Sequence, residues 1–113
     1  MIVGTAAGEI FMGTAGRDAT QGLGGADLLT GLEGNDVICG SIGNDRLFGG
    51  AGNDQLLGDG GNDQLTGVTG NNRLDGGPGF ARFDGHTGHD QCNGGQPAAG
   101  DRAANCGQVN SVP

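Results

Sequence analysis

Residues 31–75 read GLEGNDVIC-GSIGNDRLF-GGAGNDQLL-GDGGNDQLT-GVTGNNRLD, one nine-residue unit repeated five times. The same register extends outward from this stretch, from Gly4 to Asn93, without a single insertion or deletion. A strict short period is typical of solenoid proteins, in which each unit buries its apolar face only against its neighbours. The register therefore predicts the architecture before any individual residue is considered.

The unit G-x-x-G-N-D-x-L-x divides into a turn and a strand. Glycines at positions one and four, followed by Asn-Asp, favour positive φ angles and side-chain-to-backbone hydrogen bonds, so the first six residues predict a turn. Positions seven to nine set one apolar side chain between two outward ones, which predicts a three-residue strand. Position eight is the predicted core, in two facing rows: Phe11, Leu29, Leu47, Leu65 and Phe83, opposite Thr20, Ile38, Leu56, Leu74 and Cys92.

Position six carries a carboxylate in most units. If two units make one turn of the solenoid, these side chains form two columns in which neighbours are about 4.8 Å apart. Carboxylates at that spacing repel each other, and partial burial strengthens the repulsion. Such a stack requires a cation between its coils. The first column is Glu9, Asp27, Asp45, Asp63 and Ala81, and the second column is Asp18, Asp36, Asp54, Asn72 and Asp90.

Calcium fits the donors of these columns better than other metals do. It takes about six to eight oxygens from carboxylates and carbonyls at about 2.3–2.6 Å, whereas magnesium demands tighter octahedral geometry and zinc prefers His or thiolate. The EF-hand loop with its closing Glu is absent. Ala81 lacks a ligand, so sites become fewer toward the C-terminus. The best sites are predicted between Asp27 and Asp45, Asp45 and Asp63, Asp18 and Asp36, and Asp36 and Asp54, with weaker ones between Glu9 and Asp27 and between Asp54 and Asn72.

The unit resembles the repeats-in-toxin (RTX) nonapeptide G-G-x-G-x-D-x-U-x. The resemblance implies an all-β fold, a right-handed parallel β-roll (a β-solenoid) with two nonapeptides per turn and about five turns over residues 1–93. It also implies several calcium ions between stacked turns, bound by position-six side chains and loop carbonyl oxygens. The paired glycine that opens some family units appears only as Gly49-Gly50 and Gly76-Gly77. The implied metal ligands are Glu9, Asp18, Asp27, Asp36, Asp45, Asp54, Asp63, Asn72 and Asp90.

Residues 94–113 fall outside the register and predict an irregular C-terminal cap. Resemblance to small secreted RTX-type proteins implies a disulfide between Cys92 and Cys106 that closes this cap. Its role would be to seal the open end of the roll against fraying and edge pairing. Cys39, at position nine, is expected to point outward, as a free thiol or in an intermolecular bridge.

The composition by itself indicates disorder, because 28 of the 113 residues are glycine and only four are aromatic. The strict register argues against disorder for the calcium-loaded chain. Ten core side chains, at roughly 1.5–3 kcal/mol each, offset only part of the chain entropy. We therefore expect folding to be coupled to calcium binding. Calcium outside cells, at millimolar concentration, suits weak multiple sites, so we expect an extracellular protein.

Thirteen acids against five Arg or Lys give a net charge of −8, which disfavours nucleic acid and anionic membranes as partners. No stretch approaches the roughly 18 apolar residues of a membrane span, and no cleavable signal peptide is visible. No Ser-His-Asp or Cys-His set emerges, so we expect no enzymatic activity. His86 and His89 form H-x-x-H, but their slots in the repeat favour loop filling over a zinc pair. Threonine is too scattered for the flat ladder of an ice-binding solenoid.

Outward apolar residues gather in the N-terminal half, at Ile10, Met12, Leu28, Val37, Phe48 and Leu57. The segment Met1-Ile2-Val3 adds an apolar strand before the first glycine. Beyond the fifth or sixth unit these outward slots turn polar. A stripe confined to one half indicates an interface. Two alternatives follow: a calcium-loaded filament or matrix subunit that associates with copies of itself, or the C-terminal module of a larger secreted protein.

Overall fold

The computed structural model describes residues 2–78, 80–93, 102–104 and 108–110. Regular structure in this part of the chain is entirely β, so no helix in it is long and apolar enough to cross a membrane. Most strands have three residues and occupy positions seven to nine, as predicted. The strands are β1 (Ile2–Val3), β2 (Ile10–Met12), β3 (Ala19–Gln21), β4 (Leu28–Thr30), β5 (Val37–Cys39), β6 (Arg46–Gly50), β7 (Gln55–Leu57), β8 (Asp63–Val68), β9 (Arg73–Asp75), β10 (Ala81–Asp84), β11 (Gln91–Asn93), β12 (Arg102–Ala104) and β13 (Gln108–Asn110).

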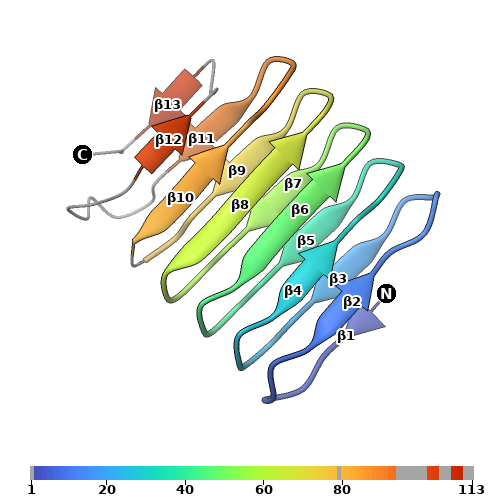
Figure 1. The fold of residues 1–113 in the computed structure, drawn as a ribbon, viewed down its shortest axis with the longest axis vertical. Coiled ribbons are helices and arrows are strands. Elements are labelled where there is room, and N and C mark those ends of the chain that lie inside the picture. Colours follow the sequence, from blue (N-terminus) through green and yellow to red (C-terminus); the bar gives the residue numbers. More distant parts are fainter. Residues whose placement is uncertain (1, 79, 94–101, 105–107, 111–113) are drawn as a thin grey trace.

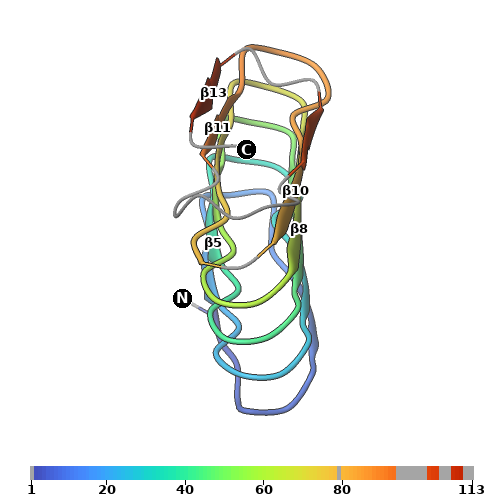
Figure 2. The same ribbon diagram turned by 90° about the vertical axis from the view of Figure 1, so that its left-hand side faces the viewer.

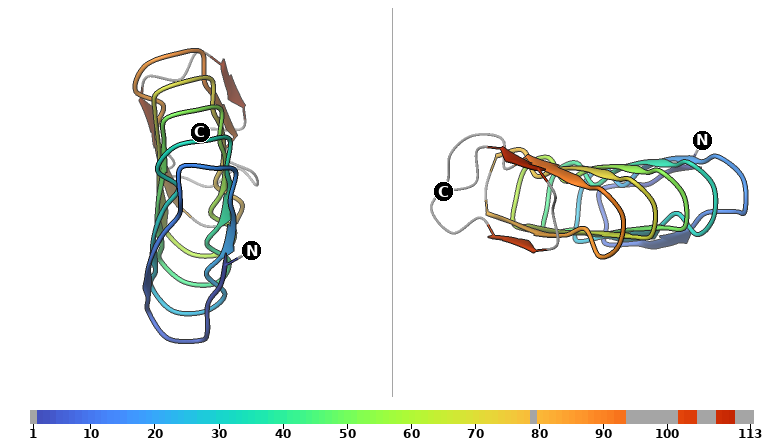
Figure 3. Two further views of the ribbon diagram at one scale, coloured as in Figure 1. Left: turned by 90° about the vertical axis from the view of Figure 1, so that its right-hand side faces the viewer. Right: turned by 90° about the horizontal axis from the view of Figure 1, so that it is seen from above.

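The strands form two parallel sheets that face each other across a narrow core (Figure 1). Odd-numbered strands pair in the order β1-β3-β5-β7-β9-β11-β13, and even-numbered strands in the order β12-β10-β8-β6-β4-β2. The chain crosses from one sheet to the other after every strand, which makes it a β-solenoid of about five turns. Figures 2 and 3 show the coils as flattened loops stacked along one axis.

Strand pairing joins equivalent residues of every second unit, which confirms that two nonapeptides make one turn. On one sheet Leu29 lies beside Leu47, and on the other Ile38 lies beside Leu56. Side chains of a strand alternate between its two faces, so a slip of one residue would expose the whole core. The apolar residue at position eight therefore holds the register of the stack.

The core consists of one row of side chains from each sheet, as predicted. The position-eight residues from Leu29 to Leu74 are almost wholly buried, and Phe83 and Cys92 extend the two rows. Phe11 packs against the same cluster but is only partly buried. This thin core leaves the loops at the two edges of the flattened coils, where the position-six residues lie.

The glycines of the unit have two different roles, and the sequence prediction was right about one of them. Position four adopts a positive φ in every described unit from Gly25 onward, as predicted. At Gly52, where φ is 114°, a Cβ would also collide with the carbonyl oxygen of Gly34 in the neighbouring coil. Position-one glycines have no positive φ among the described residues, so the prediction was wrong for them. From Leu23 onward, the residue at position two has a positive φ instead.

Past Asn93 each sheet gains one more strand, since β12 pairs with β10 and β13 pairs with β11. The prediction of an irregular cap over 94–113 did not include these strands. Most of that segment, with Cys106, lies outside the described residues, so the bridge to Cys92 stays a prediction. Cys39 is a half-buried free thiol whose Sγ lies 3.5 Å from Ser41 Oγ and from Asp59 Oδ2. Burial raises the pKa of this thiol.

Candidate metal centre

The position-six residues lie where the chain crosses between the two sheets, either in the crossing loop or, for Asp63 and Ala81, at the first residue of the strand that follows it. The crossings that follow odd-numbered strands carry the first column, and those that follow even-numbered strands carry the second column. Each column therefore runs along one narrow edge of the stacked coils (Figure 2). The fold brings the predicted ligands of each column together, one per coil.

From Asp27 onward, each aspartate of the columns uses one carboxylate oxygen to bind the neighbouring coil. Oδ1 of Asp45 accepts the backbone N–H of Asp27 at 2.8 Å, and Oδ1 of Asp63 accepts that of Asp45 at 2.9 Å. In the second column, Oδ1 of Asp54 accepts the N–H of Asp36 at 2.8 Å. The predicted side-chain-to-backbone bonds therefore exist, but they join two coils and do not close the turn that carries the aspartate.

The second carboxylate oxygen has no hydrogen-bond partner in six of these units. The six side chains are buried, with at most 2% of their surface exposed. Most buried polar atoms in proteins are paired, and an ionised group left buried without compensation costs several kcal/mol. Because the same atom is unpaired in unit after unit, the feature belongs to the repeat itself. The unpaired atoms are Oδ2 of Asp27, Asp36, Asp45, Asp54, Asp63 and Asp90.

These unpaired oxygens face a small space that the position-one glycine keeps open. A Cβ placed on Gly31 would collide with Oδ2 of Asp36 and would lie 2.7 Å from the carbonyl oxygen of Gly49 in the next coil. The position-one glycine is therefore needed for space and not for its backbone angles. A carboxylate oxygen and a carbonyl oxygen that border one small space are the donors that a hard cation takes.

The electrostatics of the columns oppose ionisation. Burial raises the pKa of Asp63 to about 8 and the pKa values of Asp45 and Asp54 to about 6. The backbone N–H that each carboxylate accepts lowers its pKa, and the carboxylate of the preceding coil raises it again. The pKa values of Asp36 and Asp90 are raised by burial as well. Near neutral pH a cation is therefore needed to keep the columns fully charged.

The two ligands predicted nearest the N-terminus differ from the others. Thr14 donates its backbone N–H to Oδ2 of Asp18 at 2.6 Å, and its hydroxyl oxygen lies 3.1 Å from Oδ1. Thr5 makes the same two kinds of contact with Glu9, at 2.7 and 3.1 Å. Both carboxylates therefore have partners within their own loops. The sequence pattern ranked the pair of Asp18 and Asp36 among the best sites and gave no sign of these contacts.

A second ladder in the same loops is formed by the position-five asparagines. Oδ1 of Asn35 accepts the backbone N–H of Asn53 at 2.9 Å, and Oδ1 of Asn53 accepts that of Asn71 at 2.9 Å. These bonds run from coil to coil in the direction opposite to the aspartate bonds. Asparagine recurs at position five of the sequence, and this regularity indicates the ladder. Because asparagine also favours turns, the sequence alone did not show that its side chain bonds to the neighbouring coil. The loops are therefore stacked by neutral contacts as well as charged ones.

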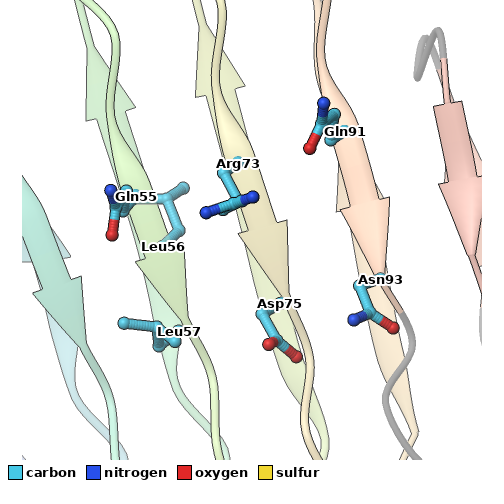
Figure 4. A pocket seen from close by; sticks show the side chains of 7 residues that line it. All are labelled: Gln55, Leu56, Leu57, Arg73, Asp75, Gln91 and Asn93. Carbon is cyan, nitrogen blue, oxygen red and sulfur yellow. The ribbon is translucent and has the colours of Figure 1, made fainter.

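The other candidate groups do not assemble into a site in the described part of the chain. His86 Nε2 lies 3.7 Å from Asp84 Oδ2 on the surface, and His89 donates its backbone N–H to Asn71. A shallow hollow on the outer face of β7, β9 and β11 holds Arg73 between Gln55 and Gln91 (Figure 4). Its lining also includes Leu56, Leu57, Asp75 and Asn93.

The donors that the loops present fit calcium. Among the described residues, no group of three His, Cys, Asp or Glu side chains could hold a metal ion. An ion between the coils would therefore take backbone carbonyls together with carboxylates, which is the donor set of a hard cation and not of zinc. The unpaired Oδ2 atoms and the space above the position-one glycines meet that requirement.

The model of the RTX calcium-binding nonapeptide repeat (4 copies) matches residues 3–38, 12–47, 31–65, 40–73 and 66–96. The chain belongs to this RTX family. No match was found among curated proteins or among solved structures. The repeats of this RTX chain bind calcium, and they do so on a β-roll whose two columns hold the carboxylates.

Two units of this RTX roll lack the family's carboxylate, namely those of Asn72 and Ala81. Asn72 lies in the second column and keeps the coil-to-coil bond, because its Oδ1 accepts the N–H of Asp54 at 2.9 Å. Ala81 lies in the first column and has no such atom. In its place the N–H of Asp63 donates to the carbonyl oxygen of Phe80 at 3.2 Å. Both interruptions occur near the C-terminal end, where the sequence predicts fewer calcium sites.

Proposed function

We propose that this chain is an extracellular structural element whose coils become stable when calcium binds between the loops. The observation that carries the proposal is the set of six buried carboxylate oxygens without a partner. Each would be ionised in calcium-bound form and repelled by the next carboxylate of its column. A divalent ion shared between two coils removes that repulsion and pairs the oxygens at the same time. Its binding free energy is then part of the folding free energy.

Calcium binding of this kind suits a compartment rich in the ion. Extracellular calcium modules have dissociation constants of about 10⁻⁴–10⁻³ M, and sites built from one or two carboxylates and loop carbonyls belong in that class. In the cytosol such sites would remain empty and the chain would lose its stabilising ions. The proposed role is structural, because an ion that pairs oxygens of two neighbouring coils completes the fold.

The test is a circular dichroism titration of the whole chain with calcium and with EGTA. In saturating calcium the spectrum should show the parallel β signal, and excess EGTA should remove most of it. Magnesium at the same concentration should restore little, because it requires stricter octahedral geometry and keeps its water. An unchanged β signal in excess EGTA would refute the coupling of folding to calcium.

A second candidate role, as a subunit of a calcium-loaded filament or matrix, rests on the outer face of the N-terminal strands. Ile10 and Met12 of β2, on the outer face of the six-stranded sheet, are 73% and 64% exposed. Phe48 borders a shallow hollow in the same half of the roll, with Leu32 and Val68. These residues provide an apolar surface for a second copy, or for another part of a larger secreted protein.

A further inference from the structure

Asn72 occupies the place of an aspartate in the second column without leaving an unpaired atom. Only 3% of its surface is exposed. Its Oδ1 accepts the backbone N–H of Asp54, and its own backbone N–H donates to Oδ1 of Asp90 at 2.7 Å. The column therefore continues through this unit as it does through the aspartate units.

The Asn72 unit differs from the aspartate units in the second terminal atom of the side chain, which is the amide nitrogen Nδ2 instead of the carboxylate oxygen Oδ2. Nδ2 lies against Gly67, where a Cβ would meet it at 2.5 Å, just as Oδ2 of the aspartates lies against the position-one glycine of their units. From there it donates to the carbonyl oxygens of Thr69 at 3.3 Å and Gly70 at 3.4 Å. The orientation of the amide is determined, because an atom that accepts the N–H of Asp54 must be the oxygen.

An amide in this position does electrostatically what a cation does in the other units. In an aspartate unit, carboxylate and carbonyl oxygens border the same space and only a positive charge can pair them. In the Asn72 unit, two N–H bonds carry partial positive charge toward the carbonyls, and the side chain has no net charge to be repelled. The carbonyl oxygens of this loop are therefore paired by a side chain of the same unit and need no cation.

The next unit along the chain closes its space by a different route. A Cβ on Gly76 would collide with the Cβ of Ala81 and with the ring of Phe83, which is itself nearly inaccessible. Hydrocarbon thus occupies the position that faces a carboxylate oxygen in the aspartate units. The two units are consecutive, so together they span one coil, residues 67–84, of which the structure describes 67–78 and 80–84.

We propose that residues 67–84 form a metal-free coil, in which the Asn72 amide replaces one calcium ion and the Ala81 and Phe83 side chains fill the place of another. The inference rests on the proposed calcium sites in the remaining units. The metal-free coil separates two calcium-binding parts of the roll. One is a continuous ladder of calcium sites in the coils that carry Asp27 to Asp63, and the other is a single site at Asp90. The metal-free coil keeps its loops paired at any calcium concentration, so it joins the two calcium-dependent parts.

The test is the calcium stoichiometry of the Asn72→Asp chain, measured by native mass spectrometry in saturating calcium. N72D should bind at least one more calcium ion than the wild type, because the unit regains an unpaired oxygen and frees its loop carbonyls. The matched control is Asn71→Asp, which adds the same charge one residue away, on an exposed position-five side chain, and should add no ion. If the wild type binds calcium and N72D binds the same number of calcium ions, the inference is overturned. A wild type that binds no calcium at all would overturn the proposed function instead.

The reverse substitution keeps the inference falsifiable if N72D does not fold. Asp54→Asn places an amide in the same column one coil earlier, where it should satisfy the carbonyls of its own loop. D54N should lose at least one ion and keep its β signal in calcium, whereas Asp54→Ala should lose the ion and much of that signal. If D54N retains the wild-type stoichiometry, or loses as much β signal as D54A, an amide does not replace the ion.

Discussion

At the scale of single residues, position two of the unit is where this chain departs furthest from the family pattern. Several units place a residue other than glycine there, yet the backbone is left-handed: φ is 73° at Leu32 and 75° at Val68. Side chains in this region cost roughly 1–2 kcal/mol per residue, and a β-branched residue such as Val68 is the least suited to it. The paired glycines supply the same backbone without strain, with φ of 90° at Gly50. The angle is positive at position two from Leu23 onward, whichever residue stands there, but not at Thr5 or Thr14 in the first two units.

Val68→Gly should therefore stabilise the calcium-loaded chain, by about 1 kcal/mol after the entropy that glycine loses on folding is subtracted. The measurement is the free energy of unfolding in urea at saturating calcium. Thr66→Gly is the matched control, because Thr66 lies at position nine of the same strand β8 with ordinary extended backbone. It should destabilise by about 0.5–1 kcal/mol. A loss of stability in V68G would show that the left-handed backbone at this position carries no strain.

At the scale of elements, carboxylates in successive coils affect each other's ionisation, as at Asp45 and Asp63. Oδ1 of Asp63 accepts the backbone N–H of Asp45, and burial together with the Asp45 carboxylate raises the pKa of Asp63. The asparagine ladder beside each column is neutral and does not titrate. The raised pKa values in the columns therefore contribute to the dependence of stability on pH.

Without calcium, the stability of the roll should fall as the pH rises. The folded pKa values of Asp45 and Asp54, about 6, and of Asp63, about 8, exceed the ordinary value of 3.8. The stabilisation that these three carboxyl groups give the folded chain is fully present below about pH 3.8. It is lost as the pH rises through about 6 and then about 8, because the folded chain must release protons that the unfolded chain has already lost. In EGTA, the β signal should be larger near pH 4.5 than near pH 8.

In saturating calcium the trend should reverse over the same range of pH. Calcium requires ionised carboxylates, so lower pH removes its ligands and releases the ion. Urea midpoints or β signal, measured at matched pH values with EGTA and with calcium, give the two curves. Curves that run parallel would mean that the columns neither titrate as buried acids nor bind the ion.

At the scale of the whole molecule, the roll is asymmetric along its axis. Its N-terminal coils carry exposed apolar side chains on the outer face of the sheet that contains β2, while the same slots in β8 and β10 hold Gln64, Thr66 and Arg82. At the N-terminal end the edge strand β2 pairs only with β4 among the described strands. An apolar face beside an open strand edge favours association with another copy.

We predict that the calcium-loaded wild type forms dimers or larger species and that the double variant Ile10→Lys, Met12→Lys is monomeric. The two lysines place charge on the proposed interface and leave the core untouched, since both side chains are exposed. Size-exclusion chromatography with light scattering gives the mass of each. The control carries lysine at the equivalent positions of β8, Gln64→Lys with Thr66→Lys, and should associate like the wild type. A monomeric wild type in calcium would remove the filament from consideration.

Much of this architecture was open to prediction because it depends on period and residue type alone. A nine-residue register with one apolar residue at position eight requires short strands, two sheets and a core of two rows, and Leu29 to Leu74 form that core. The pairing of position-six residues two units apart follows once two units make one turn, which the resemblance to the RTX repeat implied, and Asp27 and Asp45 show it. Contacts that recur with every repeat can be derived from the repeat pattern of the sequence.

What the tertiary structure alone decided is how the atoms of one coil meet those of the next. From Asp27 onward, the offset between coils directs Oδ1 of each column aspartate to a backbone N–H of the preceding coil and leaves Oδ2 unpaired beside a position-one glycine, as at Asp36 and Gly31. Position two is left-handed from Leu23 onward, and the Asn72 amide reaches two carbonyls. Residue type and spacing determined which groups line the edges of the roll. The stacking of coils determined which of those groups need a cation, because pairing depends on distances between chain segments that local preferences do not set.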